Sequence, residues 1–166
     1  ERALEQFHNA YELSPTDLVT LQGLGELLYE QEEWSQAARV LQDLQLHHEA
    51  RLERSQLVEV FYRLGSIRLK LNDLRSAAQY FDRALEVEQY HQPTLESRVE
   101  VAKAQSKWDE VVHFTRWLLE TEQDPTVRFA HLVQIGDILA TKMQQGQQAV
   151  GAYQEALELD PQSVAI

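Results

Sequence analysis

Small and apolar residues recur along the chain at alternating intervals of four and three residues. A small residue is followed four positions later by a large apolar one, and three positions after that by another small or apolar residue. These intervals place the three side chains on one face of a helix. The four triplets are Ala3-Phe7-Ala10, Ala37-Leu41-Leu44, Ala77-Phe81-Ala84 and Ala149-Tyr153-Ala156.

A second motif, an apolar residue followed by glycine, precedes three of the triplets: Leu24-Gly25, Leu64-Gly65 and Ile135-Gly136. Glycine costs roughly 1 kcal/mol relative to alanine inside a helix, so its recurrence indicates a steric need. We expect each glycine to lie where two helices cross, opposite the first alanine of the triplet, with the large residue filling space toward the neighbouring repeat. The pattern predicts helices at about 2–13, 17–31, 34–47, 50–71, 74–89, 93–106, 108–122, 125–143 and 147–159.

Pairs of helices that recur at a fixed period predict an all-α solenoid. Ala3 and Ala37 are 34 residues apart, and so are Ala77 and Val111, whereas the other two gaps, from Ala37 to Ala77 and from Val111 to Ala149, are 40 and 38 residues. The segments FYRLGSIRLKLNDLRSAAQYFDRAL (61–85) and AVGAYQEALELDP (149–161) resemble the tetratricopeptide repeat family. The resemblance extends over essentially the whole chain and implies one right-handed superhelical array of antiparallel helix hairpins. Its expected parts are the second helix of a truncated repeat (1–15) and repeats at about 17–49, 50–91, 93–124 and 125–161.

Three departures from the repeat pattern carry expectations of their own. Extra residues around HHEARLERSQ (47–56) are interpreted as an extension of the helix at 50–71, which would overhang its neighbours. The repeat at 93–124 has Arg98 and Val99 where the apolar-glycine pair belongs. The turn MQQGQ (143–147) is one residue longer than its equivalents, and Gly146 is expected to supply a positive φ there.

The chain is acidic, with 15 Lys and Arg against 27 Asp and Glu and a formal net charge of −12. Such a charge disfavours nucleic acid, whose binding depends on clustered basic residues. No apolar run is long enough to span a bilayer and no N-terminal apolar stretch suits a secretory signal, so we expect no membrane insertion. The absence of cysteine excludes disulfides and thiolate sites, and is compatible with either cytoplasm or periplasm. Since the chain begins without Met and midway through a repeat, we expect it to be a fragment of a longer protein.

Candidate catalytic or metal-binding residues are sparse. His47 and His48 are adjacent, so on a helix they point about 100° apart and suit a helix C-terminus better than a shared metal ion. Asp109 and His113 are spaced to meet on one helix face, which is more typical of a surface pair than of a metal site. No phosphate-binding loop or hydrolase motif is present. The sequence therefore predicts neither an enzyme nor a cofactor or metal site.

The resemblance implies a concave binding groove lined by the first helix of each repeat, at positions three before and one, four and five after the glycine. Carried over, these positions are Gln22, Glu26, Tyr29 and Glu30; Tyr62, Ser66, Leu69 and Lys70; Glu96, Glu100, Lys103 and Ala104; and Val133, Asp137, Ala140 and Thr141.

This lining restricts the partner. One subclass of the family grips the C-terminal carboxylate of heat-shock chaperones with Lys and Asn at the first two positions. Neither residue occurs there in this chain, so that ligand is not expected. Acidic residues beside Tyr29 and Tyr62 favour a protein or peptide that carries Lys or Arg together with an apolar anchor. The alternative is that these carboxylates contact no partner and only keep one face of each helix exposed to water.

Two other functions remain open from the sequence. The first helix, with Phe7, lacks its partner, and the last, with Tyr153 and Leu157, has no polar capping helix before Ile166. Uncovered ends of this kind favour end-to-end self-association. The array is also compatible with a docking or sensing module of a larger enzyme or regulator.

Overall fold

The computed structural model describes residues 2–160, apart from the side chains of residues 2–4 and 8. The side chain of Ala3 and the residues Pro161 and Ile166 therefore lie outside the described part. Within it, all regular secondary structure is helical. The chain divides into two compact units, Glu1–Gln89 and Tyr90–Ile166.

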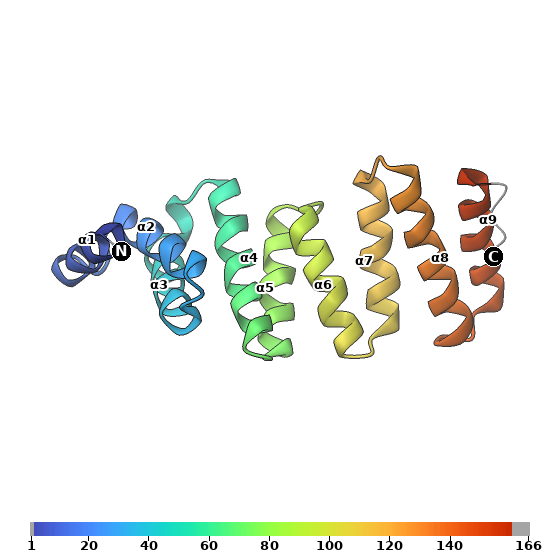
Figure 1. The fold of residues 1–166 in the computed structure, drawn as a ribbon, viewed down its shortest axis with the longest axis horizontal. Coiled ribbons are helices and arrows are strands. Elements are labelled where there is room, and N and C mark those ends of the chain that lie inside the picture. Colours follow the sequence, from blue (N-terminus) through green and yellow to red (C-terminus); the bar gives the residue numbers. More distant parts are fainter. Residues whose placement is uncertain (1, 161–166) are drawn as a thin grey trace. The chain divides into compact units, whose positions relative to one another are not determined.

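The first unit contains two helix hairpins preceded by a single helix (Figure 1). Helix α1 (Arg2–Leu13) packs against α2 (Leu18–Glu30), which pairs with α3 (Trp34–His48). Helix α4 (Arg54–Lys70) pairs with α5 (Leu74–Val87) and also contacts α3. The expected all-α architecture of helix pairs is confirmed here.

The second unit contains two further hairpins (Figure 1). Helix α6 (Gln92–Ala104) pairs with α7 (Trp108–Thr121), and α8 (Pro125–Thr141) pairs with α9 (Gly146–Leu159). Pro125 occupies the first turn of α8, where a proline loses no helical hydrogen bond, and Asp124 caps that turn by accepting from the Thr126 amide.

Close helix crossings explain the glycines of the repeated motif. A Cβ on Gly25 would lie 2.8 Å from Leu41, one on Gly65 would lie 2.6 Å from Phe81, and one on Gly136 would lie 2.3 Å from Tyr153. These distances are shorter than van der Waals contact, so a hydrogen atom is what lets each pair of helices touch. The first alanines of the matching triplets, Ala37, Ala77 and Ala149, are at most 2% exposed.

In three of the four triplets, the large residue lies against the glycine of its own hairpin. Leu41, Phe81 and Tyr153 were expected to fill space toward the neighbouring repeat. The structure places each of them against the glycine of its own helix pair, and Leu41 also lines a cavity together with Val60 of the next hairpin. Phe7 of α1 reaches the next hairpin as well: a Cβ on Gly23 of α2 would lie 2.3 Å from its ring. Gly23 follows Gln22 and so lies outside the apolar-glycine motif that the repeats share.

The expected extension of the helix at 50–71 is wrong. Helix α3 continues to His48, a 3-10 turn follows at Glu49–Arg51, and α4 begins only at Arg54. A capping box between Glu53 and Gln56 fixes that start, because each residue hydrogen-bonds the backbone amide of the other. The extra residues therefore form a connection rather than an overhanging helix.

The expectation for Gly146 is also wrong. Gly146 begins α9, and the positive φ belongs to Gln144, at 55°. The other three hairpin turns have the same left-handed residue, at Glu32, Asn72 and Ser106. In each of these three, the next amide reaches back five residues to a helix carbonyl, as from Glu33 to Leu28, which closes the helix end.

Candidate functional site

The residues carried over as groove positions all lie on the first helices of the hairpins. In the first unit they are on α2 and α4, where Glu26, Glu30 and Lys70 are exposed and Ser66 is buried. In the second unit they are on α6 and α8. Glu96, Glu100 and Lys103 are exposed there, and Val133 is half-buried.

A cavity of about 280 Å³ lies between the first helices of unit 1. Its floor is apolar and comes from α3 and α4, whereas its walls are polar and come from α2 and α4. The lining residues are Gln22, Glu26, Leu41, Leu44, Gln56, Glu59, Val60 and Arg63. Two of the expected groove positions, Gln22 and Glu26, thus share a cavity with six residues that were not expected to line the groove.

Arg63 connects the two walls of this cavity. Its Nε donates to Glu59 at 2.8 Å, its Nη2 donates to Glu26 at 3.2 Å, and the guanidinium lies 5.6 Å from the centre of the Tyr29 ring. The sequence signal for half of this arrangement is the i, i+4 spacing of Glu59 and Arg63. The contact with Glu26 has no such signal, because those residues are 37 positions apart.

Two tyrosines flank the same face of unit 1. Tyr29 is half-buried and packs edge-on against Trp34 at 5.6 Å. Burial raises the pKa of the Tyr29 phenol, an effect that the nearby Ser66 hydroxyl opposes. Tyr62 of α4 packs against Phe81, with ring centres 6.2 Å apart. Because its pKa is raised, the Tyr29 phenol stays protonated at neutral pH and has a hydrogen that it can donate.

In unit 2, His131 of α8 lies near charged residues of α6 and of the end of α7. Burial lowers the pKa of His131 on α8, and the charges of Glu122, Lys103 and Glu96 also act on it. Asp137 is occupied, because it accepts a hydrogen bond of 2.8 Å from the Tyr153 hydroxyl. Asp137 therefore supports the packing of α9 against α8.

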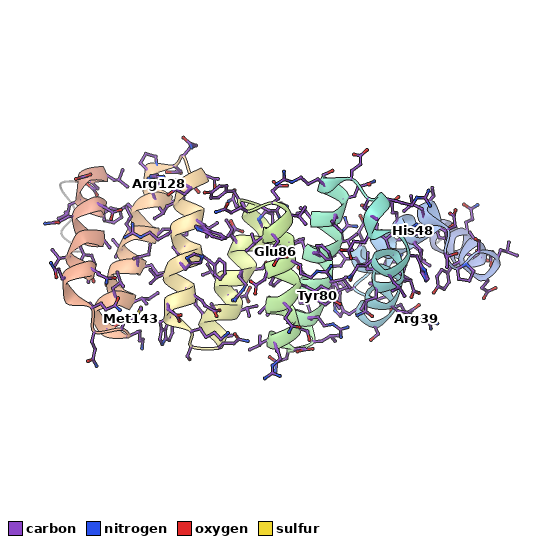
Figure 2. All side chains as sticks on the ribbon, turned by 180° about the vertical axis from the view of Figure 1, so that it is seen from behind. Arg39, His48, Tyr80, Glu86, Arg128 and Met143 are labelled. Carbon is purple, nitrogen blue, oxygen red and sulfur yellow. The ribbon has the colours of Figure 1, made fainter. Side chains whose placement is uncertain are left out.

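The histidines considered as metal ligands, His48 and His113, make contacts with neighbouring residues that hold the fold together. His48 is buried, and its Nε2 donates to the carbonyl oxygen of Thr16 at 2.6 Å (Figure 2). His113 packs against Trp117 with ring centres 4.5 Å apart. Among the side chains that the structure describes, no three His, Cys, Asp or Glu residues are grouped so as to hold a metal ion.

Comparison with known proteins identifies the repeated unit. The family model described as "Tetratricopeptide repeat" matches residues 58–91, which include all of α5 and most of α4. The chain contains a tetratricopeptide repeat. The glycine-aromatic contact between Gly65 and Phe81 lies inside this segment, and the same kind of contact joins Gly136 to Tyr153 in the last hairpin.

Solved structures share the tetratricopeptide-repeat fold over nearly the whole chain. MamA is 16% identical, with a TM-score of 0.70 over 95% of this chain and 86% of its own. YrrB, described as a TPR protein with an unusual peptide-binding site, is 22% identical, with a TM-score of 0.69 over 97% of this chain and 78% of its own. PilF of Pseudomonas aeruginosa is 18% identical, with a TM-score of 0.63 over 96% of this chain and 68% of its own. At these identities the likeness is one of fold.

No curated protein sequence matches the chain. In the part of the chain that the structure describes, no helix combines the length and the apolar character needed to cross a membrane.

Proposed function

We propose that this chain is a protein-interaction scaffold that binds a peptide segment along its first helices, without catalysing a reaction. The observation that carries the proposal is the cavity between α2 and α4, where carboxylates stand above an apolar floor. A peptide with Lys or Arg next to an apolar residue would satisfy both parts, because the cation would meet Glu26 and Glu59 while the apolar side chain would cover Leu41 and Val60.

Arg63 tunes this preference. In the free protein it neutralises part of the charge of Glu26 and Glu59, so the two carboxylates are held in place rather than left to repel each other. An incoming cation would have to compete with Arg63, which favours ligands that also bring apolar contact. Charge then steers the encounter, and apolar burial supplies most of the affinity.

The exposed acidic residues of α6 extend the proposal to the second unit. Glu96 and Glu100 are both exposed and one helical turn apart, and Glu96 accepts a hydrogen bond only from Gln92, its neighbour on the same helix, among the side-chain bonds the structure shows. Support from the comparisons is limited to one fold neighbour, YrrB, whose description names a peptide-binding site.

End-to-end self-association has less support. Of the residues that suggested it, Phe7 is packed against Gly23, and Tyr153 is packed against Gly136 and bonded to Asp137. The remaining apolar exposure on the last helix is scattered, as at Val150, and such single exposed residues are normal on a protein surface.

A phage-displayed library of random dodecapeptides tests the peptide-binding proposal. We expect selection on the immobilised chain to enrich peptides that combine Lys or Arg with a large apolar residue. Fluorescence anisotropy of an enriched peptide should show affinity reduced at least tenfold by Glu26→Gln with Glu59→Gln if it binds in unit 1. Glu96→Lys with Glu100→Lys should reduce it if it binds in unit 2.

The control is a matched change on second helices, Glu86→Lys with Glu120→Lys, since both residues are exposed and neither lines the cavity (Figure 2 labels Glu86). Enrichment of acidic peptides, or an equal loss of affinity in the control, would refute the proposal.

A further inference from the structure

A second cavity in unit 1 has a lining of the opposite character. It measures about 250 Å³ and is formed by four residues of α5 together with Arg68 near the end of α4. The lining residues are Arg68, Ser76, Gln79, Tyr80 and Arg83. Each of these side chains can donate a hydrogen bond, and no carboxylate is among them.

The four α5 residues follow the helix at intervals of three and four, so they form one stripe. Arg83 is held firmly: its Nη2 donates to both carboxylate oxygens of Glu49, at 2.9 and 3.0 Å, and its guanidinium lies 4.1 Å from the centre of the Phe61 ring. Its Nε and Nη1 hydrogens have no partner among the described residues. Arg83 therefore presents donors whose orientation is already fixed.

Tyr80 also keeps a donor. Its hydroxyl oxygen accepts a hydrogen bond of 3.3 Å from Gln42 of α3, which leaves the hydroxyl hydrogen for another acceptor (Figure 2 labels Tyr80). Gln79 is exposed at the rim of the cavity, with a free amide.

Arg68 is the least expected member. It is half-buried, yet no carboxylate of the described residues lies within ion-pair distance of it. Asp73 interacts with Arg68 at longer range, and its carboxylate accepts a hydrogen bond from the Ser76 amide. A partly exposed guanidinium without a close carboxylate keeps donors that an anion can accept from.

We infer that this cavity binds a phosphate group, with Arg68 and Arg83 as its charged donors and Tyr80 and Gln79 as its neutral ones. Arginine pairs suit this ligand because the planar guanidinium offers two parallel donors to phosphate oxygens. The formal charge of the chain, −12, repels anions in general, so saturable binding of an anion requires a local site of this kind. The site lies apart from the cavity of the proposed peptide site and shares no lining residue with it.

The test uses the whole 166-residue chain and a fluorescein-labelled peptide, Gly-Ala-Gly-phosphoserine-Gly-Ala-Gly, alongside its unphosphorylated form. Anisotropy at constant ionic strength should show saturable binding of the phosphorylated peptide alone. Arg68→Gln should weaken that binding at least tenfold, because it replaces the positively charged guanidinium with a neutral amide that can still donate a hydrogen bond. Gln79→Glu, which places a carboxylate at the exposed rim, should weaken it similarly.

Arg75→Gln is the matched control. Arg75 is an exposed residue of the same helix that does not line the cavity, so this change removes the same charge and should alter affinity less than twofold. Inorganic phosphate is then added to compete with the phosphorylated peptide, with potassium chloride as the salt control. Strong competition means that the free ion is enough to fill the site, and weak competition means that the peptide adds contacts of its own; either result supports the site. Equal binding of the two peptides with no competition by phosphate, or equal effects of Arg68→Gln and Arg75→Gln, would overturn it.

Discussion

The same substitution, glycine to alanine, should have opposite effects at two helical positions of this chain. At Gly65 in α4 a new Cβ would lie 2.6 Å from two ring atoms of Phe81, whereas at Gly151 in α9 nothing lies within 4 Å of the new atom. Neither glycine has a positive φ, so backbone strain does not differ between them. The pair isolates the steric demand of the helix crossing.

The expected magnitudes follow from two opposing terms. Alanine gains about 1 kcal/mol over glycine in a helix, so Gly151→Ala should stabilise the fold by about that amount. At Gly65 this gain is opposed by overpacking, which typically costs about 1–3 kcal/mol in a well-packed core. Phe81 is 0% exposed and has little room to move, so we place the cost near the upper end and expect net destabilisation of about 1–2 kcal/mol.

Urea unfolding followed by far-UV circular dichroism measures both changes. A double variant, Gly65→Ala with Phe81→Leu, should be more stable than the sum of the single changes predicts, because the smaller side chain makes room for the new methyl group. If Gly65→Ala stabilises the chain as much as Gly151→Ala does, the close crossing of α4 and α5 is not what selects glycine.

Two further substitutions test local features of the fold. Glu32→Gly should stabilise the fold by about 0.5–1 kcal/mol. A residue with a side chain costs about 1–2 kcal/mol in the left-handed conformation, and part of that gain is lost because glycine loses more backbone entropy on folding. Glu33→Gly, at φ −77°, should instead destabilise the fold in the same urea assay. Glu110→Gln should destabilise by about 1–3 kcal/mol at pH 7, because it breaks a 2.7 Å ion pair with buried Arg98. Burial raises the pKa of Glu110, but hydrogen bonds from Lys107 and Arg98 outweigh it and hold the pKa below its ordinary value. The carboxylate thus stabilises the fold above its unfolded pKa and loses that effect as the pH falls through the lower folded pKa. The stability difference from wild type should therefore shrink as the pH falls through that lowered pKa; a constant difference would contradict this assignment.

The repeated helix pairs could be predicted because close packing leaves a periodic trace in the sequence. A crossing that excludes a side chain selects glycine or alanine at a fixed position, and the facing residue must be large. Gly65 and Phe81 show both halves of that rule, and so do Gly136 and Tyr153. The repeat that has Arg98 at the apolar position still forms a helix pair. Its buried arginine forms an ion pair with Glu110 and lies over the ring of Phe114 on the second helix.

The connections were less predictable because they depend on backbone geometry that several residue types can adopt. Glu32 and Gln144 take a positive φ although glycine or asparagine is preferred there, and Gly146 begins a helix instead. The start of α4 depends on a reciprocal pair of hydrogen bonds from Glu53 and Gln56, which competes with a continuous apolar stripe that favoured a longer helix.

The sequence by itself determined that this chain forms paired helices, that they approach closely at Gly25, Gly65 and Gly136, and that its first helices carry acidic residues. Only the tertiary structure decided that Arg63 also reaches Glu26 and that Arg68 and Arg83 line one cavity. The physical reason is that helix periodicity fixes the face on which a residue lies, whereas contacts between helices depend on how the hairpins pack, and no local spacing records that.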